Sequence, residues 1–104
     1  MGGVNMDFNN EQKEILTNAL RTWGFTAQTD IAIEEMSELT KAIIKERRYS
    51  SSETFDNLRE EIADVMIMCE QLYMFTDPDR IQEIINKKLE RLKERLSRGE
   101  KDVP

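Results

Sequence analysis

Two short runs of this sequence, "EEMSEL" and "EEIAD", carry acidic residues at the spacing of one helical turn. Glu35 and Glu38 stand three residues apart in the first run, and Glu61 and Asp64 stand three apart in the second. Residues three apart lie on the same side of an α-helix, so each run presents two carboxylates together. Paired carboxylates can bind a hard divalent cation or transfer a proton in general acid–base catalysis.

Both acid pairs lie on the apolar side of their expected helices. At about 100° per residue, Glu35 falls in the centre of an apolar stripe and Glu38 lies about 60° from it. Glu61 and Asp64 repeat this arrangement, whereas Glu34 lies about 100° away and suits a supporting role. The stripes are formed by Ile31, Ala32, Leu39 and Ala42 in the first helix and by Leu58, Val65, Met68 and Leu72 in the second.

Four inward carboxylates need a compensating positive charge, because unpaired buried carboxylates are costly and close ones repel. One interpretation is that the acids lie on the surface or pair with buried basic residues, but Lys41 and Arg59 are expected to point away from them. The other is a divalent cation. The chain has no histidine and one cysteine, so a metal site must use oxygen ligands. We expect Mg²⁺, with Mn²⁺ as a substitute; a calcium-binding loop with its central glycine is absent from the sequence.

The composition favours one small acidic domain. The 104 residues include 21 acidic and 15 basic residues, for a formal net charge of −6. This charge argues against nucleic-acid binding, which needs a basic surface. No run approaches the ~20 apolar residues of a membrane span. Cys69 is the single cysteine, so no internal disulfide can form, and we expect a cytoplasmic protein with Cys69 as a buried free thiol.

Caps and periodicity predict four helices. Asparagines in "NN" can cap the first helix, "WGFT" breaks the pattern, and Thr26 can cap the second helix. Ser50 and Glu53 stand in capping-box spacing before the third helix. The expected helices cover about residues 11–22, 27–48, 53–76 and 78–97.

The last helix has the clearest boundaries. Asp77 is its expected cap, Pro78 lies in its first turn and Gly99 is its stop. Its inward positions are Ile85, Leu89, Leu92 and Leu96. Short turns between amphipathic helices predict an all-α antiparallel four-helix bundle. We expect a single domain over residues 1–104, with a core over about 11–97 and a loose tail over 98–104.

The third helix is apolar on more than one side, which favours self-association as a dimer or tetramer. One face carries the stripe that includes Leu58 and Phe75. Other apolar residues lie elsewhere around the helix: Met66, Ile67, Tyr73 and Met74. A helix that is apolar on two sides is usually buried on two sides, so we expect a subunit interface there.

The acid runs resemble a known enzyme signature. The run "EEMSEL" is followed, 22 residues after Glu38, by "EIAD". Together the two runs resemble the E-E-x-x-E…E-x-x-D signature of MazG-like all-α nucleoside triphosphate pyrophosphohydrolases. The stretch "WGFTAQTDIAIEEMSELTKAI" and the basic last helix resemble that family too. The resemblance covers about residues 20–95, most of the chain.

This resemblance implies a four-helix unit that dimerises or assembles further and binds magnesium. It implies hydrolysis of a nucleoside triphosphate between the α- and β-phosphates, which yields a monophosphate and pyrophosphate. The implied metal ligands are Glu35, Glu38, Glu61 and Asp64. Either Glu35 or Glu38 would orient the attacking water or take its proton.

Further candidate contacts lie outside the acid runs. Lys88, Arg91 and Arg95 follow one flank of the last helix, where they either contact substrate phosphates or form a solvated basic face. Trp23 and Gln28 precede the first acid run and are candidates to contact the base; the alternative for Trp23 is an ordinary core anchor.

A second functional class is also consistent with the sequence. In it the chain is a non-catalytic helical dimerisation or regulatory module, and the acid cluster is a structural or regulatory divalent-ion site. Magnesium-dependent turnover of a nucleoside triphosphate distinguishes the two classes.

Overall fold

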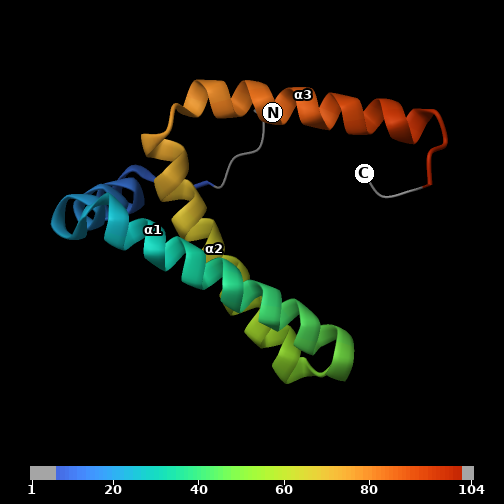
Figure 1. The fold of residues 1–104 in the computed structure, drawn as a ribbon, viewed down its shortest axis with the longest axis horizontal. Helices are drawn as coiled ribbons and strands as arrows, with labels where there is room; N and C mark the ends of the chain where they lie inside the picture. The colour runs from blue at the N-terminus through green and yellow to red at the C-terminus, as the bar shows by residue number, and fades with distance from the viewer. Residues whose placement is uncertain (1–6, 102–104) are drawn as a thin grey trace. The chain divides into compact units, whose positions relative to one another are not determined.

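The computed structural model describes residues 7–101, and within that range the chain is all-helical. The helices are α1 (Asn10–Tyr49), α2 (Ser52–Phe75) and α3 (Pro78–Ser97) (Figure 1). These helices belong to two compact units: α1 with α2 as far as Leu72 forms one, and residues 73–101 belong to the other. The all-α class is confirmed, but the described residues contain three helices rather than the four predicted.

The predicted asparagine cap of the first helix is confirmed. The Asn9 side-chain oxygen accepts a hydrogen bond from the backbone N–H of Gln12 at 2.8 Å. In return, the backbone N–H of Asn9 donates to the Gln12 side chain at 2.9 Å. This reciprocal pair satisfies two of the N–H groups that a helix start leaves without partners, and so fixes where α1 begins.

The predicted break at "WGFT" is present as a kink and not as a loop. Gly24 has φ 88° and ψ 163°, while the helix continues on both sides of it. Positive φ of this kind is accessible to glycine at little cost, so one residue can change the direction of the helix. The predicted break is therefore confirmed, but the two helical segments follow each other without a loop and form the single element α1, so Thr26 lies inside α1 rather than at a cap. Figure 1 shows the change of direction in α1.

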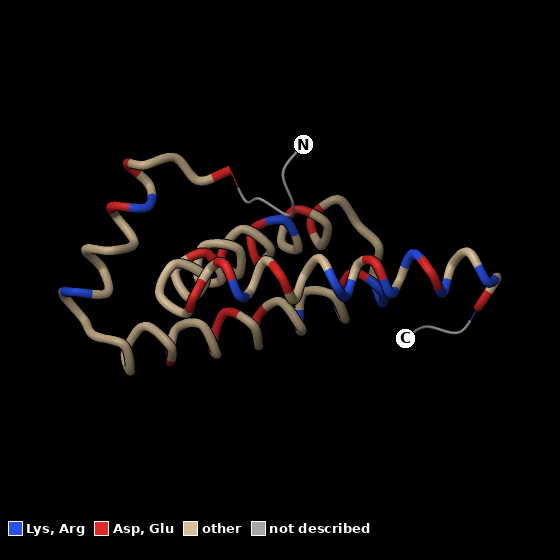
Figure 2. The backbone as a smooth tube through the Cα atoms, turned by 90° about the horizontal axis from the view of Figure 1, so that it is seen from above, with Lys and Arg blue, Asp and Glu red and all other residues tan. Residues whose placement is uncertain are grey.

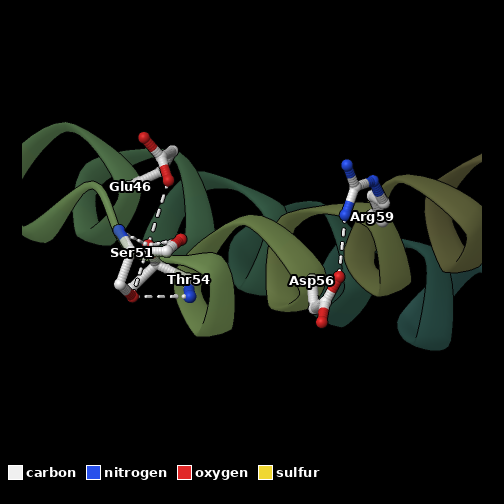
Figure 3. Close-up of polar contacts among 5 residues, drawn as sticks. All are labelled: Glu46, Ser51, Thr54, Asp56 and Arg59. Carbon is white, nitrogen blue, oxygen red and sulfur yellow. Dashed lines mark hydrogen bonds and ion pairs between the residues drawn. The ribbon is translucent and has the colours of Figure 1, made fainter.

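A tight turn joins α1 to α2. Ser50 adopts the left-handed conformation that ends α1, and its N–H donates to the Glu46 carbonyl at 2.9 Å. Ser51 then caps α2: its hydroxyl accepts from the Thr54 N–H at 3.1 Å, and its own N–H donates to the Thr54 hydroxyl at 2.9 Å (Figure 3). The predicted Ser50–Glu53 box is thus one residue out of register, because Ser50 is already used to close α1.

The α1–α2 pair is antiparallel, since residues later in α1 contact residues earlier in α2. Its core is small and includes Ala32 and Ala42, which are 3% and 0% exposed, together with Leu16 and Met68. Small alanine side chains allow the two helix backbones to approach closely. Both alanines belong to the predicted stripe, whereas Ile31 from the same stripe is 41% exposed.

Buried amides add a polar contact to this core. The Gln71 amide nitrogen donates to the Leu16 carbonyl at 3.0 Å and to the Gln28 side-chain oxygen at 2.9 Å. Leu16 and Gln28 lie on opposite sides of the Gly24 kink. Gln71 therefore holds both segments of α1 against α2.

Helix α3 begins and ends as predicted. Asp77 caps it by accepting from the Arg80 N–H at 3.2 Å, and Pro78 occupies the first turn. Gly99, with φ 75°, ends it by donating to the Leu96 carbonyl at 3.1 Å. None of its residues is buried, so the predicted inward position of its leucines is not observed.

None of the described helices is both long enough and apolar enough to cross a membrane. Cys69 is a free thiol that is half-buried rather than fully buried.

Candidate metal site

Three of the four predicted carboxylates come together between α1 and α2. Glu35, Glu61 and Asp64 each contribute one oxygen, and these oxygens all lie within 4.8 Å of one another. We call this group the acid cluster. Glu61 and Asp64 are one turn apart on α2, and Glu35 faces them because the antiparallel pairing sets the two acid runs side by side. The helical positions of these residues therefore bring the carboxylates together as predicted.

Glu61 has an oxygen that lacks a partner. Its Oε2 is buried and accepts no hydrogen bond from the residues that the structure describes. Desolvation raises the pKa of the Glu61 carboxyl above its usual range, and the negative charges of Asp64 and Glu38 raise it further. Lys45 opposes this by lowering the Glu61 pKa, but the net shift is upward. Ionised Glu61 is thus under-compensated by the protein itself.

Glu35, on the facing helix α1, also has a carboxyl pKa raised above its usual range. A hydrogen bond with Asp64 raises the pKa of the Glu35 carboxyl, and desolvation together with the charges of Asp64 and Glu61 adds to the shift. A shared hydrogen bond between two carboxyl groups is possible only while one of them carries a proton, which is why it raises the pKa. In the metal-free cluster, burial and mutual repulsion therefore both oppose ionisation of Glu35.

Glu38 lies beside the cluster but is not part of it. Its Oε1 accepts a hydrogen bond from Lys41 Nζ at 3.4 Å; the Glu38 side chain is half-buried and that of Lys41 is exposed. Its charge still contributes to the raised Glu61 pKa. The expectation that Lys41 points away from the acids is wrong for Glu38, while Arg59 does point away and pairs with Asp56 at 2.7 Å.

The acid cluster fits a hard divalent cation by its donor chemistry. All its ligand atoms are carboxylate oxygens, which Mg²⁺ and Mn²⁺ prefer. A cation there would give Glu61 Oε2 a partner and would offset the repulsion that raises the pKa of Glu35. Two half-buried glutamates with raised pKa values distinguish this group from ordinary surface acids.

The two neighbouring glutamates act through their charges. Glu34 is exposed and raises the pKa of Glu35, and Glu60 is exposed and raises the pKa of Glu61. Neither offers a ligand atom to the acid cluster. A supporting role for Glu34 is therefore electrostatic.

The predicted basic residues of α3 lie together along one groove. Lys88, Arg91 and Arg95, with Leu89 and Leu92, line a space of about 450 Å³. Figure 2 shows basic and acidic residues alternating along this helix. Arg95 Nε donates to Glu100 Oε2 at 2.9 Å, whereas Lys88 and Arg91 form no ion pair with any described residue.

The two predicted base contacts have different environments. Trp23 is 64% exposed, so its interpretation as a core anchor is wrong. Gln28 is buried, and its side-chain oxygen accepts the hydrogen bond from Gln71. The side chain that is available to a ligand is therefore that of Trp23.

Sequence reasoning missed Gln71 and Lys45. Gln71 lies 43 residues after Gln28, and nothing local in the sequence indicates their contact. Lys45 follows Glu38 by seven residues, which places it on the same side of α1 two turns later. The seven-residue spacing from Glu38 could therefore have identified Lys45 as the basic residue that lowers the pKa of Glu61.

Comparisons of the chain with protein-family models, with curated proteins and with solved structures give no match. The chemistry of the acid cluster is therefore inferred from the residues themselves.

Proposed function

We propose that the chain is a magnesium-dependent nucleoside triphosphate pyrophosphohydrolase that produces a nucleoside monophosphate and pyrophosphate. The observation that carries this proposal is the acid cluster: three carboxylates from two helices, one with an orphaned buried oxygen. These residues occupy positions of the E-E-x-x-E…E-x-x-D pattern that the sequence resembles. The absence of histidine makes an oxygen-only magnesium site the natural metal chemistry for this chain.

Glu35, Glu61 and Asp64 would hold the cation, since their oxygens already converge. The chemistry that magnesium supplies when bound is polarisation of the α-phosphoryl group and neutralisation of the triphosphate charge. Without such neutralisation, an acidic site would repel a substrate with about four negative charges.

Glu38 is the residue that we assign to the proton of the attacking water. It lies beside the cluster, and its charge acts on Glu61, yet its oxygens are not among the converging ligand atoms. In the proposed reaction the water oxygen bonds to the α-phosphorus, and the bond from that phosphorus to the bridging oxygen breaks. Pyrophosphate leaves with the bridging oxygen, and Glu38 takes a proton from the water.

Other residues would bind the substrate. Lys88 and Arg91 form no ion pair among the described residues, and their assignment to substrate phosphates rests on the resemblance of the last helix to that family. Arg95 would first have to leave Glu100. The exposed Trp23 ring offers a face on which a base can stack.

The same proposal includes self-association as a dimer or tetramer. Among the described residues of the α1–α2 unit only four apolar side chains are buried, and two of these are alanines. Many larger apolar side chains on both helices are exposed instead. A second copy would bury apolar surface that this small chain leaves in contact with water.

The test is release of pyrophosphate from a panel of ribo- and deoxyribonucleoside triphosphates, with magnesium and with chelator. We expect magnesium-dependent turnover that Glu61→Gln lowers at least about 100-fold, because loss of a metal ligand exceeds typical effects of outer partners. Glu60→Gln is the matched control: it removes the same charge one residue away, from a side chain outside the cluster.

A folded protein that releases pyrophosphate from no member of the panel contradicts the proposal. Magnesium-dependent thermal stabilisation in that case supports the non-catalytic module with a divalent-ion site. Activity in Glu61→Gln equal to that in Glu60→Gln would remove the acid cluster from the mechanism.

A further inference from the structure

Lys45 is a basic residue of α1 that the proposed mechanism does not use. It follows Glu38 by seven residues, and rotation at about 100° per residue places it within about 20° of Glu38 around the helix. Its side chain is exposed and forms no ion pair with any described residue. Lys45 also belongs to the same compact unit as the acid cluster, so its position beside the cluster does not depend on α3.

The register of α1 against α2 gives the distance between Lys45 and the acid cluster. Three side-chain contacts fix this register: Gln28 with Gln71, Glu35 with Asp64, and Glu46 with Thr54. One residue forward along α1 thus corresponds to about one residue back along α2. In this register Glu38 lies level with Glu61. Lys45 lies seven residues further along α1, which is about 10 Å nearer to the turn that joins the two helices.

The side chains of Lys45 and Glu61 lean toward each other. Every Cα–Cβ bond of an α-helix tilts toward the helix N-terminus, which for Lys45 is the direction of the acid cluster. Because α2 runs the opposite way, the same tilt directs Glu61 toward the turn. Desolvation and neighbouring acids raise the pKa of the Glu61 carboxyl, whereas the charge of Lys45 lowers it, so the two groups are within electrostatic range. They form no ion pair, which leaves room between them for an anion that also binds a cation on the cluster.

The charges of the α1–α2 pair are unevenly distributed along its length. After the Gly24 kink, no lysine or arginine occurs in residues 25–40 or in residues 60–72. The basic residues all lie between these two segments, near the turn: Lys41, Lys45, Arg47, Arg48 and Arg59. The pair is therefore more positive toward the turn. A triphosphate carries its highest negative charge on the terminal phosphate, so this gradient favours binding with that phosphate toward the turn.

We infer that Lys45 binds the pyrophosphate portion of the substrate, which lies along the α1–α2 pair with its β- and γ-phosphates toward the turn and its nucleoside toward Gln28. This inference rests on the proposed function for the class of substrate, and it adds a contact and a direction that the proposed function leaves open. With the α-phosphorus at the acid cluster, the Lys45 ammonium group faces the negative charge that develops on the departing pyrophosphate.

The test measures the binding of each product separately, by isothermal titration calorimetry in the presence of magnesium. Lys45→Gln should weaken the binding of pyrophosphate about 10- to 100-fold, because one charge-assisted contact is lost. The binding of adenosine and uridine monophosphates should not change. Lys45→Arg keeps the positive charge and should retain most of the affinity for pyrophosphate.

Arg47→Gln is the matched control. It removes the same charge two residues away, from a side chain that lies about 200° from Lys45 around α1 and is also exposed. Neither product should bind more weakly to this variant.

Calorimetry requires no turnover, so its result is separate from that of the proposed function. A wild type that does not bind pyrophosphate overturns the inference, and so does equal pyrophosphate affinity in Lys45→Gln, or an equal loss in Arg47→Gln. Weaker binding of the monophosphates alone in Lys45→Gln would reverse the direction of the substrate and also overturn it. Failure of the proposed function would instead appear as a wild type that releases no pyrophosphate from any triphosphate, although its binding of pyrophosphate still depends on Lys45.

Discussion

Two groups of polar side chains lie between α1 and α2, and they differ in how far the protein satisfies them. Gln28 and Gln71 are neutral amides that bond to each other and to the Leu16 carbonyl at 2.9 and 3.0 Å. Glu35, Glu61 and Asp64 are acids within 4.8 Å of one another, and one of their buried oxygens has no partner among the described residues. The same helix pair thus holds amides that are hydrogen-bonded within the protein and an acid cluster in which a buried oxygen lacks a hydrogen-bond partner.

This difference indicates that the amides stabilise the fold, whereas the acid cluster is the candidate for a function. The amides lose little by burial because each hydrogen bond to water is replaced within the protein. The acids lose more, since desolvation and mutual repulsion both oppose their ionised form. A cation of the kind that we propose for this site would offset both the desolvation and the repulsion of these acids.

The largest expected effect separates the two glutamates of α1. Glu38→Gln should lower turnover by about 10²- to 10⁴-fold, as expected for loss of a general base, and should retain thermal stabilisation by magnesium. Glu35→Gln should lose both, because Glu35 belongs to the acid cluster. Initial rates and melting temperatures with and without magnesium provide the measurement. Loss of magnesium stabilisation in Glu38→Gln would make Glu38 a ligand instead.

The amide group should respond in the opposite way. Gln71→Leu leaves the buried Gln28 oxygen without its donor, so we expect a loss of about 1–3 kcal/mol in the free energy of unfolding. Urea unfolding gives this value. The double variant Gln28→Leu with Gln71→Leu should lose less than the two single losses combined, because neither polar partner remains. Turnover per folded molecule should change little; a large fall in turnover at unchanged stability would show that Gln28 contacts substrate.

Substitution of Gly24 tests how much the kink between the two segments of α1 depends on glycine. Gly24→Ala should cost about 1–3 kcal/mol, because φ 88° with ψ 163° is a conformation essentially limited to glycine. A new methyl group would contact nothing within 4 Å, so the cost comes from the backbone alone. Gly99→Ala, also at positive φ but beyond the end of α3, should have a smaller effect on urea unfolding. Equal losses in the two variants would contradict a special role for the kink.

The smallest expected effect is a dependence of metal-free stability on pH. The pKa values of Glu35 and Glu61 are raised above 4.5, so the folded state binds protons more tightly than the unfolded state. Their contribution to stability is present below pH 4.5 and is lost as pH rises through the raised values. In chelator, the melting temperature of Glu61→Gln minus that of the wild type should therefore increase as pH rises toward neutral. A constant difference between the two curves would contradict the shift.

Features of the fold that depend on neighbouring residues could be predicted from the sequence. Asn9, Asp77 and Gly99 act within one helical turn, and the structure confirms each of them. The break near Gly24 was also detected, but its extent was not. Whether a helix resumes after such a residue depends on what the following segment packs against, and here that includes the distant Gln71.

The candidate site shows the same limit at the level of side chains. A helical wheel gives the direction of each Cα–Cβ bond, and that sufficed to bring Glu35, Glu61 and Asp64 together. It does not give the torsions of a long side chain. Glu38 uses that freedom to reach Lys41, so it lies beside the cluster rather than in it. The exposure of Trp23 was likewise undetermined, because it depends on packing at the kink.

Hydrolysis in water enriched in ¹⁸O tests the central claim most directly. Nucleoside triphosphates are incubated with the wild-type protein and magnesium, and the products are analysed by mass spectrometry. Attack on the α-phosphorus predicts one ¹⁸O atom in the monophosphate, unlabelled pyrophosphate, and loss of both products in Glu61→Gln. Label in pyrophosphate or in inorganic phosphate, or labelled monophosphate formed equally well by Glu61→Gln, would contradict an α-phosphoryl hydrolase built on the acid cluster.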